Sequence, residues 1–365
     1  MASSSSTQTN HQLLLSSSYT ATPAPPPTPS NQNLPSSTAS DALSRLLHHH
    51  LLPPPLLSLP SRLRPSPPLP RFSFHPNLTQ SLSTTCPPPF FQLTHHPIPS
   101  HLPKSADLHS LSLFPPSHQS PPDTWPLGHD ADGRSFCFDP ASSSSPSLSS
   151  LTELAESLEK VGLEVVEALS CAVGFDNPLR EKGRACSLMW VSLPNGPEDD
   201  EDGSAKAGLN PGRVYPYVVG LQYQVRRRKY SLLADSGWVS VEPEVDSVLV
   251  TIGDIAQVWS NGKLKKVRGR PVANLGKEES VGSSSSSCVS MCLLVTLSMD
   301  NIISPLVPLA AMMLEDSQGK DGDGDGDGDG DKTINKFCAF SFEEYAWRVY
   351  HERFHFKDPL DRYRL

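Results

Sequence analysis

The motif HERFHF near the C-terminal end has the His-Glu-x-x-His pattern of zinc metalloproteases. On a helix, His351 and His355 are one turn apart and face the same way, so both can bind one zinc ion while Glu352 acts as general base. A third ligand would have to come from Asp358 or Asp361, the acidic residues that follow. The alternative is a solvated helix face, and the sequence favours it over a zinc hydrolase.

The distribution of histidine limits the metal sites that the rest of the chain can build. Of the 13 histidines, eleven lie at or before His129, and the other two belong to the HERFHF motif. Residues 130–350 therefore contain no histidine. A metal site in that stretch would need other ligands, or histidines that reach in from outside it.

Residues 1–120 differ in composition from the rest of the 365-residue chain. They hold 23 of the 38 prolines, and Ser, Pro, His and Leu alternate without a helix or strand period. A segment without a patterned apolar face does not build a core, and proline removes backbone donors. We expect residues 1–120 to be disordered and residues 121–365 to fold as one domain, with flexible acidic insertions at 197–208 and 318–333.

Charge, hydropathy and cysteine usage limit the partners and the compartment. The net charge of -9 argues against a nucleic-acid partner. No apolar run reaches the ~18 residues of a membrane-spanning helix. The seven cysteines form no Cys-x-x-Cys pair, which indicates a reducing compartment. We expect a cytoplasmic protein that does not bind membranes, with the plastid and the nucleus as alternatives.

The sequence predicts helices at both ends of the folded part. Over 150–174, apolar residues recur every three or four positions. Ser150 and Glu153 have the spacing of a capping box, and Gly174 is a stop signal. A last helix is predicted over 341–356.

Short strands are predicted between these helices. Runs rich in Val, Tyr, Trp and Thr follow one another from residue 187 to residue 297, and turn signals separate them every 8 to 12 residues. The run AQVWS at 256–260 is included among them. This spacing indicates an all-β barrel or jelly roll.

One stretch has a specific resemblance to a known family. Residues 237–272 read GWVSVEPEVDSVLVTIGDIAQVWSNGKLKKVRGRPV. The succession of Gly-Trp-Val, Ile-Gly-Asp and Gln-Val-Trp-Ser-Asn-Gly-Lys resembles the barrel segment of plant 2-oxoglutarate- and Fe(II)-dependent dioxygenases, the isopenicillin N synthase-like family. The resemblance covers about residues 150–365. It implies a mainly β fold with flanking helices: a double-stranded β-helix (jelly-roll) barrel with an outer helix and a C-terminal helix.

The resemblance also indicates where the family's ligands would lie. The family binds iron with two histidines and one carboxylate. Its His-x-Asp motif sits a few residues after Gly-Leu and before Thr-Leu-Leu, and its second histidine follows Asn-Gly-Lys. Aligned in this way, the three iron positions are occupied by Gln224, Arg226 and Gly269. The positions that contact 2-oxoglutarate correspond to Val191, Leu193, Cys288 and Ser290, and only the serine is retained.

From these replacements we expect a degenerate member of the family. No cofactor is expected, with Fe(II) and 2-oxoglutarate bound only if the degenerate-site interpretation is wrong. The predicted function is that of a non-catalytic binding or scaffold protein. An active oxidoreductase with non-standard ligands is the alternative.

Three arginines near the lost ligands suggest an anion site. Arg226 and Arg228 alternate to the same face of a strand, and Arg270 lies beside the lost second histidine. A buried guanidinium requires an anionic partner, which would be an internal carboxylate or a small anionic ligand. The alternative places these arginines in water at the barrel rim, and the sequence favours it. The partner is otherwise unknown, either a small anion or a protein.

Overall fold

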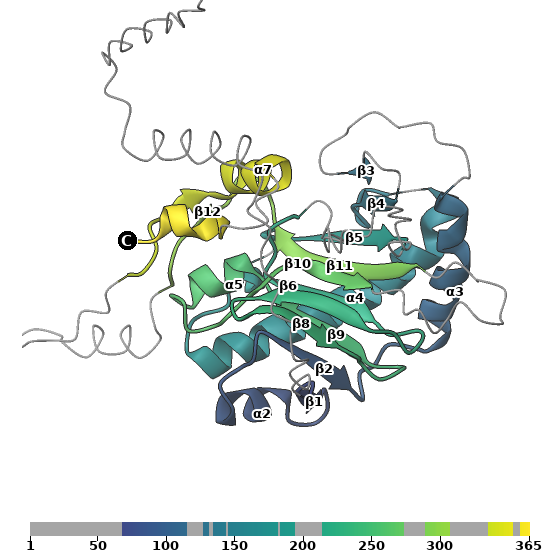
Figure 1. The fold of residues 1–365 in the computed structure, drawn as a ribbon, viewed down its shortest axis with the longest axis horizontal. Helices are drawn as coiled ribbons and strands as arrows, with labels where there is room; N and C mark the ends of the chain where they lie inside the picture. Colours follow the sequence, from purple (N-terminus) through teal and green to yellow (C-terminus); the bar gives the residue numbers. More distant parts are fainter. Residues whose placement is uncertain are drawn as a thin grey trace, which may run out of the picture. The chain divides into compact units, whose positions relative to one another are not determined.

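A large β-sheet forms the centre of the computed structural model (Figure 1). Its eight strands lie in the order β1-β2-β9-β6-β11-β5-β4-β3. Neighbours are antiparallel, except that β1 and β2 are parallel. The strands are β1 (Arg71–Ser73), β2 (Phe90–Thr94), β3 (Gly128–His129), β4 (Ser135–Phe138), β5 (Ala185–Ser192), β6 (Val219–Tyr223), β9 (Val248–Ile252) and β11 (Ser290–Leu297).

A smaller sheet packs against part of the large one. Its order is β10-β7-β8, with β10 (Val267–Ala273), β7 (Tyr230–Ala234) and β8 (Gly237–Val241). A hydrophobic cluster joins its inner face to Phe90 and Leu249 of the large sheet. The predicted mainly β, jelly-roll class is confirmed. An eight-stranded jelly roll has two sheets, and the smaller one has three strands within the described part of this chain.

The structure describes residues 68–114, 127–130, 134–143, 145–181, 183–193, 214–273, 289–306, 335–352 and 358–365. All of them belong to one compact unit, Pro65–Leu365. The expected acidic insertions at 197–208 and 318–333 lie outside the described residues. Among the helices that are described, none combines the length and the apolar character that a membrane span requires.

Helix α4 (Ser149–Val173) covers the face of the large sheet that points away from the smaller sheet. Gly162 on α4 permits close contact, because a Cβ there would lie 2.8 Å from the side chains of Leu221 and Val295. The helix ends at Gly174, which adopts a left-handed φ of 87° as predicted. The large sheet is therefore covered on both faces, so its central strands are apolar almost throughout.

The predicted capping box at the start of α4 does not form. The N-cap is Leu148, and Ser150 already lies within the helix. The Ser150 hydroxyl is 2.9 Å from Nδ1 of His109, on another helix. A long-range partner has therefore replaced the local one that the spacing suggested.

The prediction of disorder over residues 1–120 is wrong for residues 68–114. This segment contains β1, α2 (Leu78–Thr84), β2 and α3 (His101–Ser110). Strand β2 pairs with β9 at the centre of the fold, and Leu82, Phe91 and Leu93 have no exposed surface. The elements are too short and too often separated by proline to show a period, because the strands and helices that stabilise them lie far away in the sequence.

One predicted strand is a helix. The AQVWS run lies largely in α5 (Asp254–Trp259), all six residues of which are buried. A short segment that is buried on every side shows no clear helical period, so the sequence could not distinguish it from a buried strand. Short 3-10 helices occur at η1 (Leu111–Leu113), η2 (Pro146–Leu148) and η3 (Pro178–Arg180).

The C-terminal elements pack on the same core. They are β12 (Ile302–Ile303), β13 (Phe340–Ser341), α7 (Phe342–Glu352) and η5 (Pro359–Tyr363). Helix α7 confirms the predicted last helix and buries Phe342, Tyr345, Ala346 and Val349.

A buried ion-pair cluster connects this C-terminal region to the barrel. Lys266 has no exposed side-chain surface, and its Nζ donates to Asp254 at 2.5 Å and to Asp358 at 2.6 Å. Asp358 also accepts the backbone N–H of Leu360 at 3.0 Å. A buried ammonium is tolerated only when it is paired. These contacts therefore hold α5, the residue before β10 and the segment before η5 together.

We expect Leu82→Ala to lower the free energy of unfolding by about 2–5 kcal/mol, because a fully buried leucine leaves a cavity when it is truncated. Leu108→Ala is the matched control, since this leucine on α3 is 69% exposed. The control should change the free energy by about 0.5 kcal/mol or less. Urea unfolding measures both variants, and equal values would mean that residues 68–114 do not share the core.

We expect Asp358→Asn to lower the free energy of unfolding by about 3 kcal/mol, because the variant leaves Lys266 with one carboxylate. The asparagine keeps an oxygen that can accept the Leu360 N–H. Asp361→Asn is the control, because Asp361 is half-exposed and pairs with Arg364 at 2.9 Å. It should lower the free energy of unfolding by about 0.5 kcal/mol or less.

The stability difference between wild type and Asp358→Asn should also depend on pH. Burial alone would raise the pKa of Asp358, but the charge and hydrogen bond of Lys266 outweigh burial and lower it. A carboxyl with a lowered folded pKa stabilises the protein above its unfolded pKa of about 3.9, and this contribution is lost as the pH falls through the folded pKa. The stability difference between wild type and Asp358→Asn should therefore shrink below about pH 4. A difference that grows in acid would contradict the assignment.

Candidate functional site

The side chains of β5, β6 and β11 alternate between the two faces of the large sheet. One face meets α4, where the Ser187 hydroxyl donates to Glu159 at 2.7 Å. The other face meets the smaller sheet. Directly opposed residues on neighbouring strands share a face. One row on the face toward the smaller sheet therefore crosses four strands through Gln222, Cys292, Trp190 and Cys137.

The retained Ser290 belongs to the next row on this face. It lies directly opposite Ser192 at the end of β5. Val191 alternates to the α4 face and is fully buried there, and Leu193 follows the end of the strand. In β5 the inward positions are thus Trp190 and Ser192, one residue from the predicted 2-oxoglutarate contacts. Cys288 lies outside the described residues.

Gly269, the predicted position of the second histidine, forms part of a bulge in β10. The pairing of β10 with β7 shifts between Arg268 and Val272, and Gly269 adopts a left-handed φ of 73°. The Tyr217 hydroxyl lies 2.8 Å from the Gly269 carbonyl oxygen and 3.2 Å from the Thr251 hydroxyl. The bulge interrupts strand alternation, so Arg270 points inward next to a glycine that has no side chain.

Arg270 lies between the two sheets. Its guanidinium stacks over the Trp190 ring, 4.1 Å from the ring centre, and Nη1 donates to the Ser192 hydroxyl at 2.9 Å. Only 8% of the residue is exposed. Burial lowers the pKa of the guanidinium, although an arginine remains charged at any physiological pH. Burial also raises the pKa of the neighbouring Cys137 and Cys292 thiols to about 12, so both are neutral.

The other predicted anion-binding arginines do not join Arg270. Arg226 is half-exposed and pairs at 3.0 Å with Asp107, a buried carboxylate on α3 whose pKa burial raises. Arg228 is partly buried near the same carboxylate. The internal partner of Arg226 could not be found from the sequence, because Asp107 lies in the segment that was expected to be disordered.

Gln224, the predicted first iron position, is buried at the end of β6. Its backbone N–H donates to the Ser247 carbonyl at 2.9 Å. The Gly220-Leu221 pair that set this alignment lies inside β6, whereas the family motif follows its Gly-Leu and precedes a strand. The earlier Gly-Leu at 208–209 would place the two motif positions at Gly212 and Val214. Neither alignment supplies a histidine or a carboxylate.

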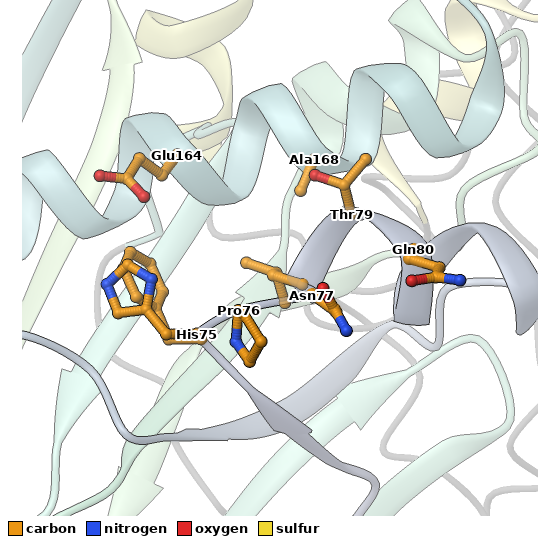
Figure 2. Close-up of a pocket in the computed structure, with 9 residues that line it drawn as sticks. His75, Pro76, Asn77, Thr79, Gln80, Glu164 and Ala168 are labelled. Carbon is orange, nitrogen blue, oxygen red and sulfur yellow. The ribbon is translucent and has the colours of Figure 1, made fainter.

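A pocket among the described residues lies outside the barrel (Figure 2). It has a volume of about 440 Å³ and is lined by residues 74–80 together with Glu164 and Ala168 of α4. His75 and Glu164 are its titratable groups, and none of the predicted site residues lines it. The pocket therefore offers no continuation of the site between the sheets.

The HERFHF motif gains no support as a zinc site. His351 is exposed, stacks on Trp347 with ring centres 4.5 Å apart, and has Nδ1 2.8 Å from the Trp347 carbonyl. His355 and the side chain of Glu352 lie outside the described residues. Asp358, a predicted third ligand, is bound to Lys266. No group of three His, Cys, Asp or Glu side chains in the described ranges has an arrangement suited to a metal ion.

Comparison with known proteins assigns the family. The family described as the 2OG-Fe(II) oxygenase superfamily matches residues 186–285, which contain most of the barrel strands. This match places the barrel of the chain in the 2OG-Fe(II) oxygenase superfamily. The predicted resemblance is therefore confirmed at the level of the superfamily.

In sequence, this chain is similar to plant dioxygenases. Gibberellin 2-beta-dioxygenase 6 of Oryza sativa subsp. japonica is 49% identical over 43 residues, 12% of each chain. The 2-oxoglutarate-dependent dioxygenase 21, chloroplastic, of the same organism is 26% identical over 122 residues, 33% of this chain and 37% of the relative. The chain thus spans well under half the length of these relatives.

Solved structures share the fold. The structure of JOX2 in complex with 2OG, Fe, and JA has a TM-score of 0.56 at 18% identity, over 84% of this chain and 92% of that one. The rice dioxygenase for auxin oxidation has a TM-score of 0.55 at 15% identity, over 81% and 100% of the two chains. At these identities the likeness concerns the fold alone.

The comparisons correct the expectation that no cofactor is involved. The superfamily is defined by 2-oxoglutarate and Fe(II), JOX2 was crystallised with 2OG and Fe, and Neurospora crassa T7H was crystallised with alpha-KG. These findings point to the use of Fe(II) and 2-oxoglutarate, and the site must be compared with both.

The described residues fit Fe(II) less well than they fit the carboxylates of 2-oxoglutarate. Iron(II) requires imidazole or carboxylate ligands. At the bulge of β10 the chain has a glycine and a buried, permanently charged arginine, which do not fit a dication. A carboxylate, by contrast, is the natural partner of a guanidinium, and Arg270 contacts Ser192, which lies directly opposite Ser290.

We expect Gly269→His to lower the free energy of unfolding by more than about 1 kcal/mol, because a non-glycine residue is strained at a φ of 73°. Gly174→Ala provides the matched control for backbone strain, since its φ is 87° and an added Cβ would meet nothing within 4 Å. Gly269→His should lower the free energy of unfolding more than Gly174→Ala does, because the histidine side chain enters a packed interior. A histidine variant as stable as wild type would mean that the bulge relaxes.

Proposed function

We propose that this protein is a non-catalytic member of the 2OG-Fe(II) oxygenase superfamily that binds a ligand in its barrel. The observation that carries the proposal is the guanidinium of Arg270, buried between the sheets beside the glycine at the second histidine position. A fixed positive charge disfavours a divalent cation there and favours an anion. The fold is retained, but a positive side chain lies where the family would bind a metal ion. This combination fits a binding role better than the oxidation reactions of the family.

An active oxidoreductase with non-standard ligands is the second candidate. Membership of the superfamily favours it, and the names of the matched plant relatives contain dioxygenase. It would need metal ligands from segments other than the inward strand positions of β5, β10 and β11. No comparable observation favours the zinc hydrolase.

The test is turnover of 2-oxoglutarate by the purified full chain with Fe(II), ascorbate and oxygen. Oxidation by this superfamily converts 2-oxoglutarate to succinate, so succinate reports the reaction without knowledge of the second substrate. We expect no succinate above a control without protein. An active dioxygenase assayed in parallel establishes that the reagents work.

Iron-dependent succinate formation would overturn the proposal. The signal would have to disappear when iron is chelated, which separates enzymatic turnover from contamination by free acid. In that case the oxidoreductase candidate would stand, and its ligands would have to be sought among the residues outside the three strands.

A further inference from the structure

We propose that Arg270, Trp190 and Gln222 form a binding site for a small hydroxycarboxylate between the two sheets. This inference rests on the proposed function and gives its ligand a chemical class. It is carried by buried polar atoms that have no hydrogen-bond partner among the described residues.

The first observation is the isolation of the Arg270 charge. Other cations at the barrel are paired with carboxylates: Lys266 with Asp254 and Asp358, and Arg226 with Asp107. Within the described ranges, no carboxylate lies within ion-pair distance of Arg270, whose contacts are the Ser192 hydroxyl and the Trp190 ring.

Asp130 is a described acidic residue that acts on Arg270 from a distance. Its Oδ1 already accepts the backbone N–H groups of Arg134 and Ser135 at 2.9 and 3.0 Å. A buried charge without a counter-charge is costly. Among the described residues the guanidinium has no counter-charge in contact, which favours an anion bound from solution.

The second observation is a set of buried polar atoms without hydrogen-bond partners. Three are donors: Nε of Arg270, Nε1 of Trp190 and Nε2 of Gln222. Two are acceptors: Oε1 of Gln222 and Oε1 of Gln224. Such atoms are rare in folded proteins, because each one costs about 1–3 kcal/mol.

These atoms lie on the same side of the large sheet. Gln222 and Trp190 are both opposite Cys292, one on each neighbouring strand, so all three face the smaller sheet. Arg270 comes from that smaller sheet, with its guanidinium over the Trp190 ring, and Cys292 is among the groups that act on its charge. Arg270 keeps 8% of its surface exposed.

The donors and acceptors together select the ligand. A carboxylate takes the charge of Arg270 and accepts from its Nε–H and from the Trp190 N–H. A hydroxyl group on the same molecule donates to an orphan glutamine oxygen and accepts from the Gln222 amide. Plain carboxylates leave the acceptors unsatisfied, and inorganic phosphate offers no carbon skeleton for the apolar walls. The complementary ligand is a small carboxylic acid with a hydroxyl group.

The test uses matched acids in a thermal-shift titration of the dialysed full chain. Malate is compared with succinate, and glycolate with acetate, so that each pair differs by one hydroxyl group. We expect the hydroxy acid of at least one pair to raise the melting temperature by about 5–10 °C at about 100 times its Kd. The plain acid should act at least about tenfold more weakly, since one unmet buried hydrogen bond costs about that factor. Phosphate should give no shift.

Three variants assign the effect to the site. Arg270→Met should abolish the shift, and Gln222→Leu should remove the preference for the hydroxy acid. Arg227→Met is the control, because Arg227 is exposed and pairs with Glu242, and it should respond like wild type. Should Arg270→Met fail to fold, Arg270→Lys keeps the charge without the planar fork and should weaken binding at least about tenfold.

No shift with any acid, or an equal shift in Arg270→Met and wild type, would overturn the site. Measured without ligand, Arg270→Met should melt no lower than wild type, because it removes an unpaired buried charge. A lower melting temperature together with no ligand response would make Arg270 a structural residue. The succinate assay is independent: turnover would reject the non-catalytic proposal, whereas no turnover and no shift would reject the hydroxycarboxylate site alone.

Discussion

The hydroxyl of Tyr217 holds the centre of this barrel together. It lies within hydrogen-bond distance of the Gly269 carbonyl on the smaller sheet and of the Thr251 hydroxyl on the large one. The contact fixes a bulge whose glycine has a left-handed backbone, and the bulge turns Arg270 into the interior. Without it, strict alternation would place the side chain of residue 269 inward and that of residue 270 outward. The chemistry of the site thus depends on the geometry of one strand.

Much of the fold was predictable because its signals are local. The period of α4, the stop at Gly174 and the β-rich runs each follow from neighbouring residues. The segment 68–114 was not predictable, because Leu82 and Phe91 are buried by elements far away in the sequence. The run AQVWS was misassigned because its helix is buried on all sides.

The site was predictable in composition and less so in geometry. The absence of histidine from residues 130–350 and the arginine beside Gly269 are visible in the sequence. The inward position of Arg270 depends on a bulge, and bulges have no reliable signature. The contributions of Trp190 and Ser192 depend on which face of β5 is inward, and a shift of one residue reverses that choice. Superfamily membership then limits the chemistry to be tested, because it points to Fe(II) and 2-oxoglutarate, whereas the residues between the sheets fit an acid better than a metal.

The buried cluster of Lys266 also has a consequence for synthesis of the chain. Its second carboxylate, Asp358, lies 92 residues further along. Lys266 and Asp254 are therefore synthesised long before Asp358. During that interval Lys266 has one of its two carboxylate partners. The buried cluster is therefore completed only after most of the barrel has been synthesised.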